Sequence, residues 1–166
     1  MAAIPNTLAQ YRRLASLPAG GWLFSRLVCW KAPYFGSIRP RVVTLEPDRC
    51  VIEIRHRRGV QNHIGTVHAI ALCNLAEMVA GLCSEASLPV SMRWIPKGME
   101  VEYLAKANGR MRATGVTGVP AVHADQGYEL PIKVSITDPA GVEVMRANIR
   151  MWATPRPARG QVKGAP

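Results

Sequence analysis

One acidic residue, Glu77, lies inside the most apolar helical segment that the sequence predicts, which runs from Thr66 as N-cap to about Ser84. A helix that is apolar around its whole circumference is expected to be buried. A buried carboxyl group is costly unless it is paired or hydrogen-bonded, and burial should raise its pKa toward the range that is useful for a general base. Glu77 could therefore activate a water molecule or attack a carbonyl carbon directly. The competing interpretation is a structural carboxylate at a subunit interface.

The loop before this helix adds three groups that could assist such chemistry. The free N–H groups at the start of a helix lie at the positive end of its dipole, so the N–H of Ala69 could stabilise an oxyanion. Asn62 could orient a reacting group, or it could simply shape the turn before Gly65. His68 is more readily explained as a residue that fixes the junction between loop and helix than as one that transfers protons.

The residues from Asn62 to Glu77 resemble the hotdog-fold thioesterases of the phenylacetate-pathway type. Those proteins carry an Asn, then Gly-Thr-Val-His-Gly-Gly, then an acidic residue on the buried helix. The sequence is still more similar to a bacterial hotdog subgroup with the pattern Asn-His-x-Gly, His-Ala, Ala-Leu and Leu-Ala-Glu. In strand order the resemblance extends over residues 41–153. It implies hydrolysis of an acyl-CoA or acyl-carrier thioester to a carboxylate and a free thiol.

The resemblance also implies a role for each matching residue. Glu77 would be the general base or nucleophile, Asn62 would orient the thioester or the water, Ala69 would supply the oxyanion hole, and His68 completes the catalytic set. Substrate contacts are predicted for His63, Gly65, Thr66, Ile70, Asn74, Arg93 and Lys97. No metal or redox cofactor is expected, because coenzyme A arrives as part of the substrate.

Two alternatives remain open. The family's Gly-Gly is replaced by Ala69-Ile70, and Pro96 stands near the position of a family Ser or Thr. These departures favour a non-catalytic hotdog protein that binds acyl-CoA or an acyl carrier. The spacing of His63 and Glu77 resembles that of hotdog dehydratases acting on β-hydroxyacyl thioesters, although their Gly-His-Phe-Pro run is absent.

The element order predicts an α+β domain of residues 1–153, with helices in 6–30 ahead of a hotdog core in 41–153. Strands are expected at 41–45, 50–56, 99–103, 111–115, 130–137 and 142–153, with Asn108-Gly109 as a hairpin turn. Because no β-α-β alternation occurs, an antiparallel sheet should curl around the apolar helix and bury its whole girth. Trp22, Phe24 and Trp30 are expected to anchor the N-terminal helices over the sheet or the acyl tunnel. Residues 154–166 should form a disordered basic tail.

Composition limits the partners and the surroundings. The 166 residues carry a net charge of +10, which favours phosphates, nucleic acid or a membrane surface, unless the charge serves only solubility. Candidate basic patches are Arg93, Lys97, Arg110 and Arg112 on strands, and the run Arg55-His56-Arg57-Arg58. No recognition-helix pattern supports specific nucleic-acid binding. No segment is expected to span a membrane, and unpaired cysteines favour the cytoplasm.

The resemblance finally implies self-association as a dimer or as a tetramer built from dimers. The site would then lie at the subunit interface. Glu77 of one subunit would face the loop from Asn62 to Ala69 of the other.

Overall fold

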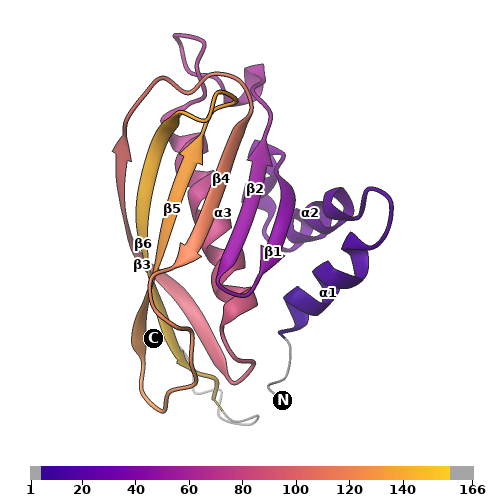
Figure 1. The fold of residues 1–166 in the computed structure, drawn as a ribbon, viewed down its shortest axis with the longest axis vertical. Coiled ribbons are helices and arrows are strands. Elements are labelled where there is room, and N and C mark those ends of the chain that lie inside the picture. The colour runs from indigo at the N-terminus through magenta and orange to yellow at the C-terminus, as the bar shows by residue number, and fades with distance from the viewer. Residues whose placement is uncertain (1–4, 158–166) are drawn as a thin grey trace.

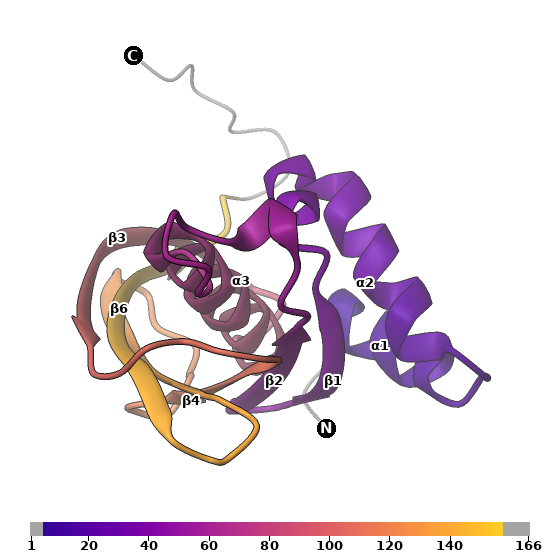
Figure 2. The same cartoon turned by 90° about the horizontal axis from the view of Figure 1, so that it is seen from above.

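The computed structural model describes residues 5–157, in which a six-stranded antiparallel sheet curls around one helix (Figures 1 and 2). The helices are α1 (Asn6–Ala15), α2 (Gly20–Lys31) and α3 (Ala69–Ser87), with short 3-10 helices η1 (Pro33–Ile38) and η2 (Arg58–Val60). The strands are β1 (Arg41–Glu46), β2 (Arg49–Ile54), β3 (Met92–Tyr103), β4 (Met111–Thr117), β5 (Tyr128–Thr137) and β6 (Glu143–Pro155). This is the α+β hotdog arrangement that the sequence predicts.

The strands follow the order β1-β2-β4-β5-β6-β3, which leaves β1 and β3 at the two edges of the sheet. The predicted hairpin at Asn108-Gly109 is therefore wrong, because β3 pairs with β6 while β4 pairs with β2 and β5. Gly109 does have the positive φ (78°) of a turn. Its N–H donates to Nδ1 of His56 at 3.1 Å, so the turn is anchored beyond the end of β2. Long-range burial of the strands has overridden the local turn signal.

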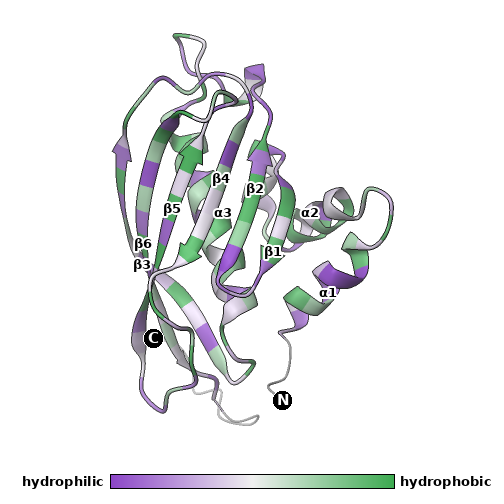
Figure 3. Cartoon of the chain, viewed as in Figure 1, coloured by the Kyte–Doolittle hydropathy of each residue, from purple (hydrophilic) through white to green (hydrophobic). Residues whose placement is uncertain are grey.

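The concave face of the sheet and α3 together form the core. Strand residues alternate between the two faces, as the banding in Figure 3 shows. The inward residues of β5 are Leu130, Ile132, Val134 and Ile136, and all four are buried against the helix side. At β4 the helix approaches so closely that a Cβ on Gly115 would lie 2.4 Å from Cγ1 of Val79. Glycine at this position lets α3 pack directly on the sheet.

The helix is not buried around its whole girth, which corrects the sequence prediction. Glu77 is exposed and Ile70 is 57% exposed, because the sheet ends at β3 before it closes around α3. The helix also begins later than predicted, with His68 rather than Thr66 as its N-cap, and it continues to Ser87 before Leu88-Pro89 ends it. Of the described helices, only α3 is long and apolar enough to cross a membrane by composition, but it is mostly buried and is the core helix.

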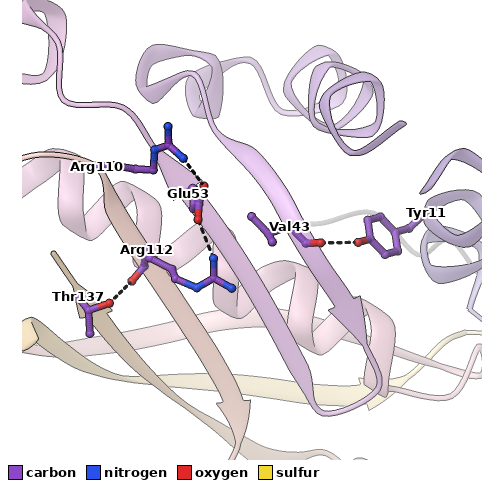
Figure 4. Close-up of polar contacts among 6 residues, drawn as sticks. All are labelled: Tyr11, Val43, Glu53, Arg110, Arg112 and Thr137. Atoms are coloured by element: carbon purple, nitrogen blue, oxygen red, sulfur yellow. Dashed lines mark hydrogen bonds and ion pairs between the residues drawn. The ribbon is translucent and has the colours of Figure 1, made fainter. Parts of the chain in front are cut away.

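The N-terminal helices cover the β1 edge of the sheet. Phe24 of α2 is buried and meets the ring of Tyr11 edge to face, with 5.2 Å between the ring centroids. The Tyr11 hydroxyl donates to the carbonyl of Val43 in β1 (Figure 4). Phe24 is thus an anchor as predicted, whereas Trp22 and Trp30 are exposed and the prediction of packing roles for them is wrong.

The two longest strands exceed their predicted bounds. β3 begins at Met92 and includes Pro96, which a sheet edge tolerates because the missing N–H can face away from the neighbouring strand. β6 continues through Thr154 and Pro155, so the predicted tail begins later than expected. The remainder of that tail, residues 158–166, lies outside the described residues.

All four cysteines are free thiols, in agreement with the sequence. Burial raises the pKa of Cys83 to about 12, with the charge of Asp48 adding to the shift and a hydrogen bond with Ser87 opposing it. Burial also raises the pKa of Cys50. Both thiols therefore stay protonated and belong to the core.

The close approach of α3 to β4 can be tested with Gly115→Ala. The added methyl must displace Val79 or the strand, so we expect a loss of about 1–3 kcal/mol in the free energy of unfolding, measured with urea. Gly36→Ala is the control, because its Cβ would meet only ordinary contact, at 3.9 Å from Cβ of Cys29. Equal stability of the two variants would show that the helix has room to move.

Candidate functional site

The loop that precedes α3 is held rigid by the side chain of Asn62. Its Oδ1 accepts hydrogen bonds from the N–H groups of Ile64 (3.1 Å) and Thr66 (3.0 Å), and its Nδ2 donates to Oγ1 of Thr66 (2.8 Å). Gly65 supplies the positive φ of 81° that this tight loop requires. Asn62 is therefore a turn residue, and only one of its two side-chain N–H donors is hydrogen-bonded within the described residues.

His68 caps the helix. Its Nδ1 accepts the N–H of Ile70 at 3.0 Å, and its own N–H donates to the carbonyl of Val60 at 2.8 Å. An accepting Nδ1 places the proton of a neutral imidazole on Nε2. The structure thus gives His68 the junction role that the sequence favoured over proton transfer.

Ala69 is the first residue of α3, and its N–H meets no acceptor in residues 5–157. The next N–H, that of Ile70, is already used by His68. The helix start therefore presents one unpaired backbone donor at the positive end of the dipole. The oxyanion role of Ala69 stays a prediction, for which this helix start offers a single donor.

Glu77 lies on the exposed side of α3 that faces β3. One turn before it, Sγ of Cys73 lies 3.1 Å from the hydroxyl of Tyr103. One turn after it, Gly81 packs against Trp94, whose ring would be 3.0 Å from a Cβ on the glycine. Glu77 therefore sits between two points where helix and strand touch. Its carboxylate makes no hydrogen bond within the described part of the chain.

The residues of β3 that face α3 follow from the strand register. Met99, Val101 and Tyr103 lie opposite Ile149, Ala147 and Met145 of β6, which are buried toward the helix. The hydrogen bond with Cys73 raises the pKa of Tyr103 to about 12, and burial and the electrostatic effect of Cys73 add to the shift. Tyr103 is thus a neutral phenol at physiological pH, with its hydroxyl engaged by Cys73.

A small cavity of about 200 Å³ adjoins the start of the helix and is lined by His68, Ile70 and Asn74, among others. Asn74 is 7% exposed, and its Nδ2 donates to Oγ of Ser37 at 3.1 Å. Its Oδ1 is buried and has no partner within residues 5–157. A buried acceptor without a donor favours a polar ligand group beside it. Three of the predicted site residues thus meet at this cavity.

Other predicted site residues lie elsewhere. His63 is exposed in the loop and forms no described hydrogen bond. Arg93 bonds to Oγ1 of Thr154, and Nζ of Lys97 lies 3.7 Å from the centroid of the Trp152 ring. These two cations occupy the convex face of the sheet, away from Glu77. Substrate contacts by His63, Arg93 and Lys97 remain predictions.

Sequence reasoning missed Cys73, Trp94 and Tyr103 as neighbours of Glu77. The alternation of Met99, Val101 and Tyr103 was visible in the sequence. Only the pairing of β3 with β6 shows that this set faces the open side of the helix.

Comparison with known proteins places this geometry in a family. Residues 20–153 match the family model described as "Domain of unknown function (DUF4442)". The chain belongs to the DUF4442 family. No curated protein matches it in sequence.

Several solved structures share this fold. The structural-genomics protein APC5556 is 40% identical, with 90% of this chain and 99% of that chain covered and a TM-score of 0.76. A Pseudomonas aeruginosa protein, PA5026, described as a probable thioesterase, is 22% identical over 84% and 97% of the two chains, with a TM-score of 0.70. The Haemophilus influenzae thioesterase HI1161 is 10% identical over 81% and 91%, with a TM-score of 0.69. This DUF4442 protein therefore has a thioesterase-type hotdog fold.

The capping role of His68 predicts a specific pattern of stabilities. His68→Ala leaves the N–H of Ile70 without an acceptor and should cost about 1 kcal/mol of unfolding free energy. His68→Asn should recover most of this, because asparagine is among the best N-cap residues. Denaturant unfolding measures both. A His68→Asn protein as unstable as the alanine variant would contradict the capping role.

Proposed function

We propose that this DUF4442 protein hydrolyses acyl-CoA or acyl-carrier thioesters to a carboxylate and a free thiol. The observation that carries the proposal is that one helix presents an exposed carboxylate, Glu77, on the side that faces β3 and an unpaired N–H, that of Ala69, at its start. These are the base and the oxyanion donor that acyl transfer to water requires.

In the proposed reaction the thioester oxygen accepts the N–H of Ala69. Glu77 takes a proton from water as the water oxygen bonds to the carbonyl carbon, and the tetrahedral intermediate then releases the thiolate, which takes that proton from Glu77. The remaining N–H of Asn62 could orient the water or the thioester, and the Tyr103 hydroxyl could do so when the Cys73 thiol is the donor in their contact. Tyr103 thus offers a hydroxyl that Pro96 does not.

Distance along the helix argues that two chains build one site. Ala69 and Glu77 are two turns apart on α3, which is about 12 Å at 1.5 Å per residue. A single carbonyl group must lie about 3 Å from both the donor and the nucleophile. Glu77 of one subunit therefore works with the loop from Asn62 to Ala69 of a second copy.

The surface around Glu77 supports such a dimer. β3 is an edge strand with one side unpaired, and the loop, helix and strand expose large apolar side chains. These are Ile64, Ile70, Met99, Tyr103 and Leu104. Apolar surface beside an open strand edge is typical of an interface. A second copy would bury these residues and enclose Glu77.

Coenzyme A enters as part of the substrate, and the proposal assigns no metal or redox cofactor. Within residues 5–157 no three His, Cys, Asp or Glu side chains gather as metal ligands. The cytoplasm remains the predicted location.

Glu77→Gln tests the proposal. The amide cannot take a proton from water, so the rate of thiol release from a panel of acyl-CoA substrates should fall at least about a hundredfold. Glu102→Gln is the matched control: this exposed carboxylate is on β3 next to Tyr103 but alternates to the opposite face. We expect its rate to stay within about twofold of the unaltered protein.

A near-normal rate for Glu77→Gln would exclude Glu77 as the base. If the unaltered protein binds acyl-CoA, measured by calorimetry, yet releases no thiol from any substrate, the non-catalytic binding function replaces hydrolysis.

A further inference from the structure

The helix α2 has two apolar faces, and the rest of the described protein covers only one of them. Phe24, Ser25 and Cys29 are buried on the side toward β1. On the opposite side Leu23 is 40% exposed, Leu27 46% and Trp30 82%. The spacing of these three residues, i, i+4 and i+7, aligns them in one stripe along the helix. An exposed apolar stripe of this kind indicates an interaction surface.

Cationic side chains border this stripe. At 100° per residue, Arg26 lies on one side of the row formed by Leu23, Leu27 and Trp30, and Lys31 lies on the other. Both are exposed. Tyr34, in η1 directly after the helix, is exposed as well. Long cationic side chains beside an apolar stripe with aromatic residues are typical of helices that lie in a lipid–water interface.

On the Arg26 side the stripe adjoins a cleft of about 440 Å³ that is rich in arginine. Trp22 and Arg26 of α2 line it, together with Arg39, Arg41, Arg55, Arg57 and Arg110. The one carboxylate in the lining, Glu53, is engaged by Arg110 and by Arg112, the latter at 2.6 Å (Figure 4). Nε of Arg57 is buried without a partner in the described residues. The cleft thus holds guanidinium groups that no carboxylate of the lining neutralises, which suits phosphate.

A second copy of the chain is a poor occupant for this face. A symmetric contact would bring two arginine clefts together, and like charges at close range repel. A surface of anionic phospholipids offers the complementary charge and an apolar layer for the stripe. Trp and Tyr also favour that boundary because their rings are part apolar and part polar.

We propose that α2 docks the protein on an anionic phospholipid surface. Leu23, Leu27 and Trp30 enter the boundary between headgroups and acyl chains, and the cleft arginines bind lipid phosphates. α2 lies beyond β1, on the opposite side of that strand from α3 (Figure 2). Docking through α2 therefore leaves the side of α3 that carries Glu77 accessible.

Flotation of the full-length protein with vesicles tests this. Vesicles of phosphatidylcholine containing about a third phosphatidylglycerol should bind the protein, and pure phosphatidylcholine vesicles should bind it at least tenfold more weakly. The double variant Leu27→Ser, Trp30→Ser should lower binding to the anionic vesicles at least tenfold. The matched control Val119→Ser, Val122→Ser alters two exposed valines in the loop after β4 and should bind normally.

The cleft is tested separately. Arg41→Gln and Arg55→Gln should each weaken binding to anionic vesicles about fivefold, whereas Lys133→Gln on the exposed face of β5 should have a smaller effect. The proposal is overturned by equal binding to neutral vesicles, or by unchanged binding of the Leu27→Ser, Trp30→Ser protein. It is also overturned if anionic vesicles do not bind the protein and either of two other results is found. The first is self-association, measured by sedimentation, that the Leu27→Ser, Trp30→Ser protein has lost. The second is binding of inorganic pyrophosphate, measured by calorimetry.

Discussion

The packing of α3 inside the curl of the sheet is the constraint on which the rest of the structure depends. Three sides of the helix are filled, with Leu75, Met78 and Val79 fully buried and Gly115 allowing direct contact with β4. The fourth side stays open because β3 ends the sheet. Of the two carboxylates on α3, Glu85 is held by Nε1 of Trp94 and by Thr7. Glu77 is the one left facing solvent.

This arrangement divides the molecule into two working faces. On one side, α3 and β3 combine the Glu77 carboxylate with the unpaired N–H of Ala69 and with exposed apolar side chains, and in the proposed reaction the site is complete only with a second chain. On the other side, beyond β1, α2 presents leucines and Trp30 beside an arginine-rich cleft. The two faces adjoin at η1, because Tyr34 beside the α2 stripe also lines the cavity at the start of α3.

Much of the fold could be predicted because it is encoded in local patterns. Alternation in β5, the apolar run of α3 and the motif from Asn62 to Glu77 are each readable within a few residues. The exposure of Glu77 could not be predicted in this way, since it depends on β3 being the edge strand at which the sheet ends. The same holds for the turn at Gly109 and for Trp30, whose surroundings come from residues distant in sequence. Periodicity predicts that a helix has apolar sides but not which of them the chain itself will cover.

The central claim is that hydrolysis needs Glu77 of one chain and the helix start of another. Its most direct test is to measure acyl-CoA hydrolysis per chain across a dilution series while sedimentation equilibrium reports the fraction of dimer. The account predicts that activity per chain falls in parallel with the dimer fraction and vanishes in the monomer. Constant activity per chain in a monomeric sample would contradict it.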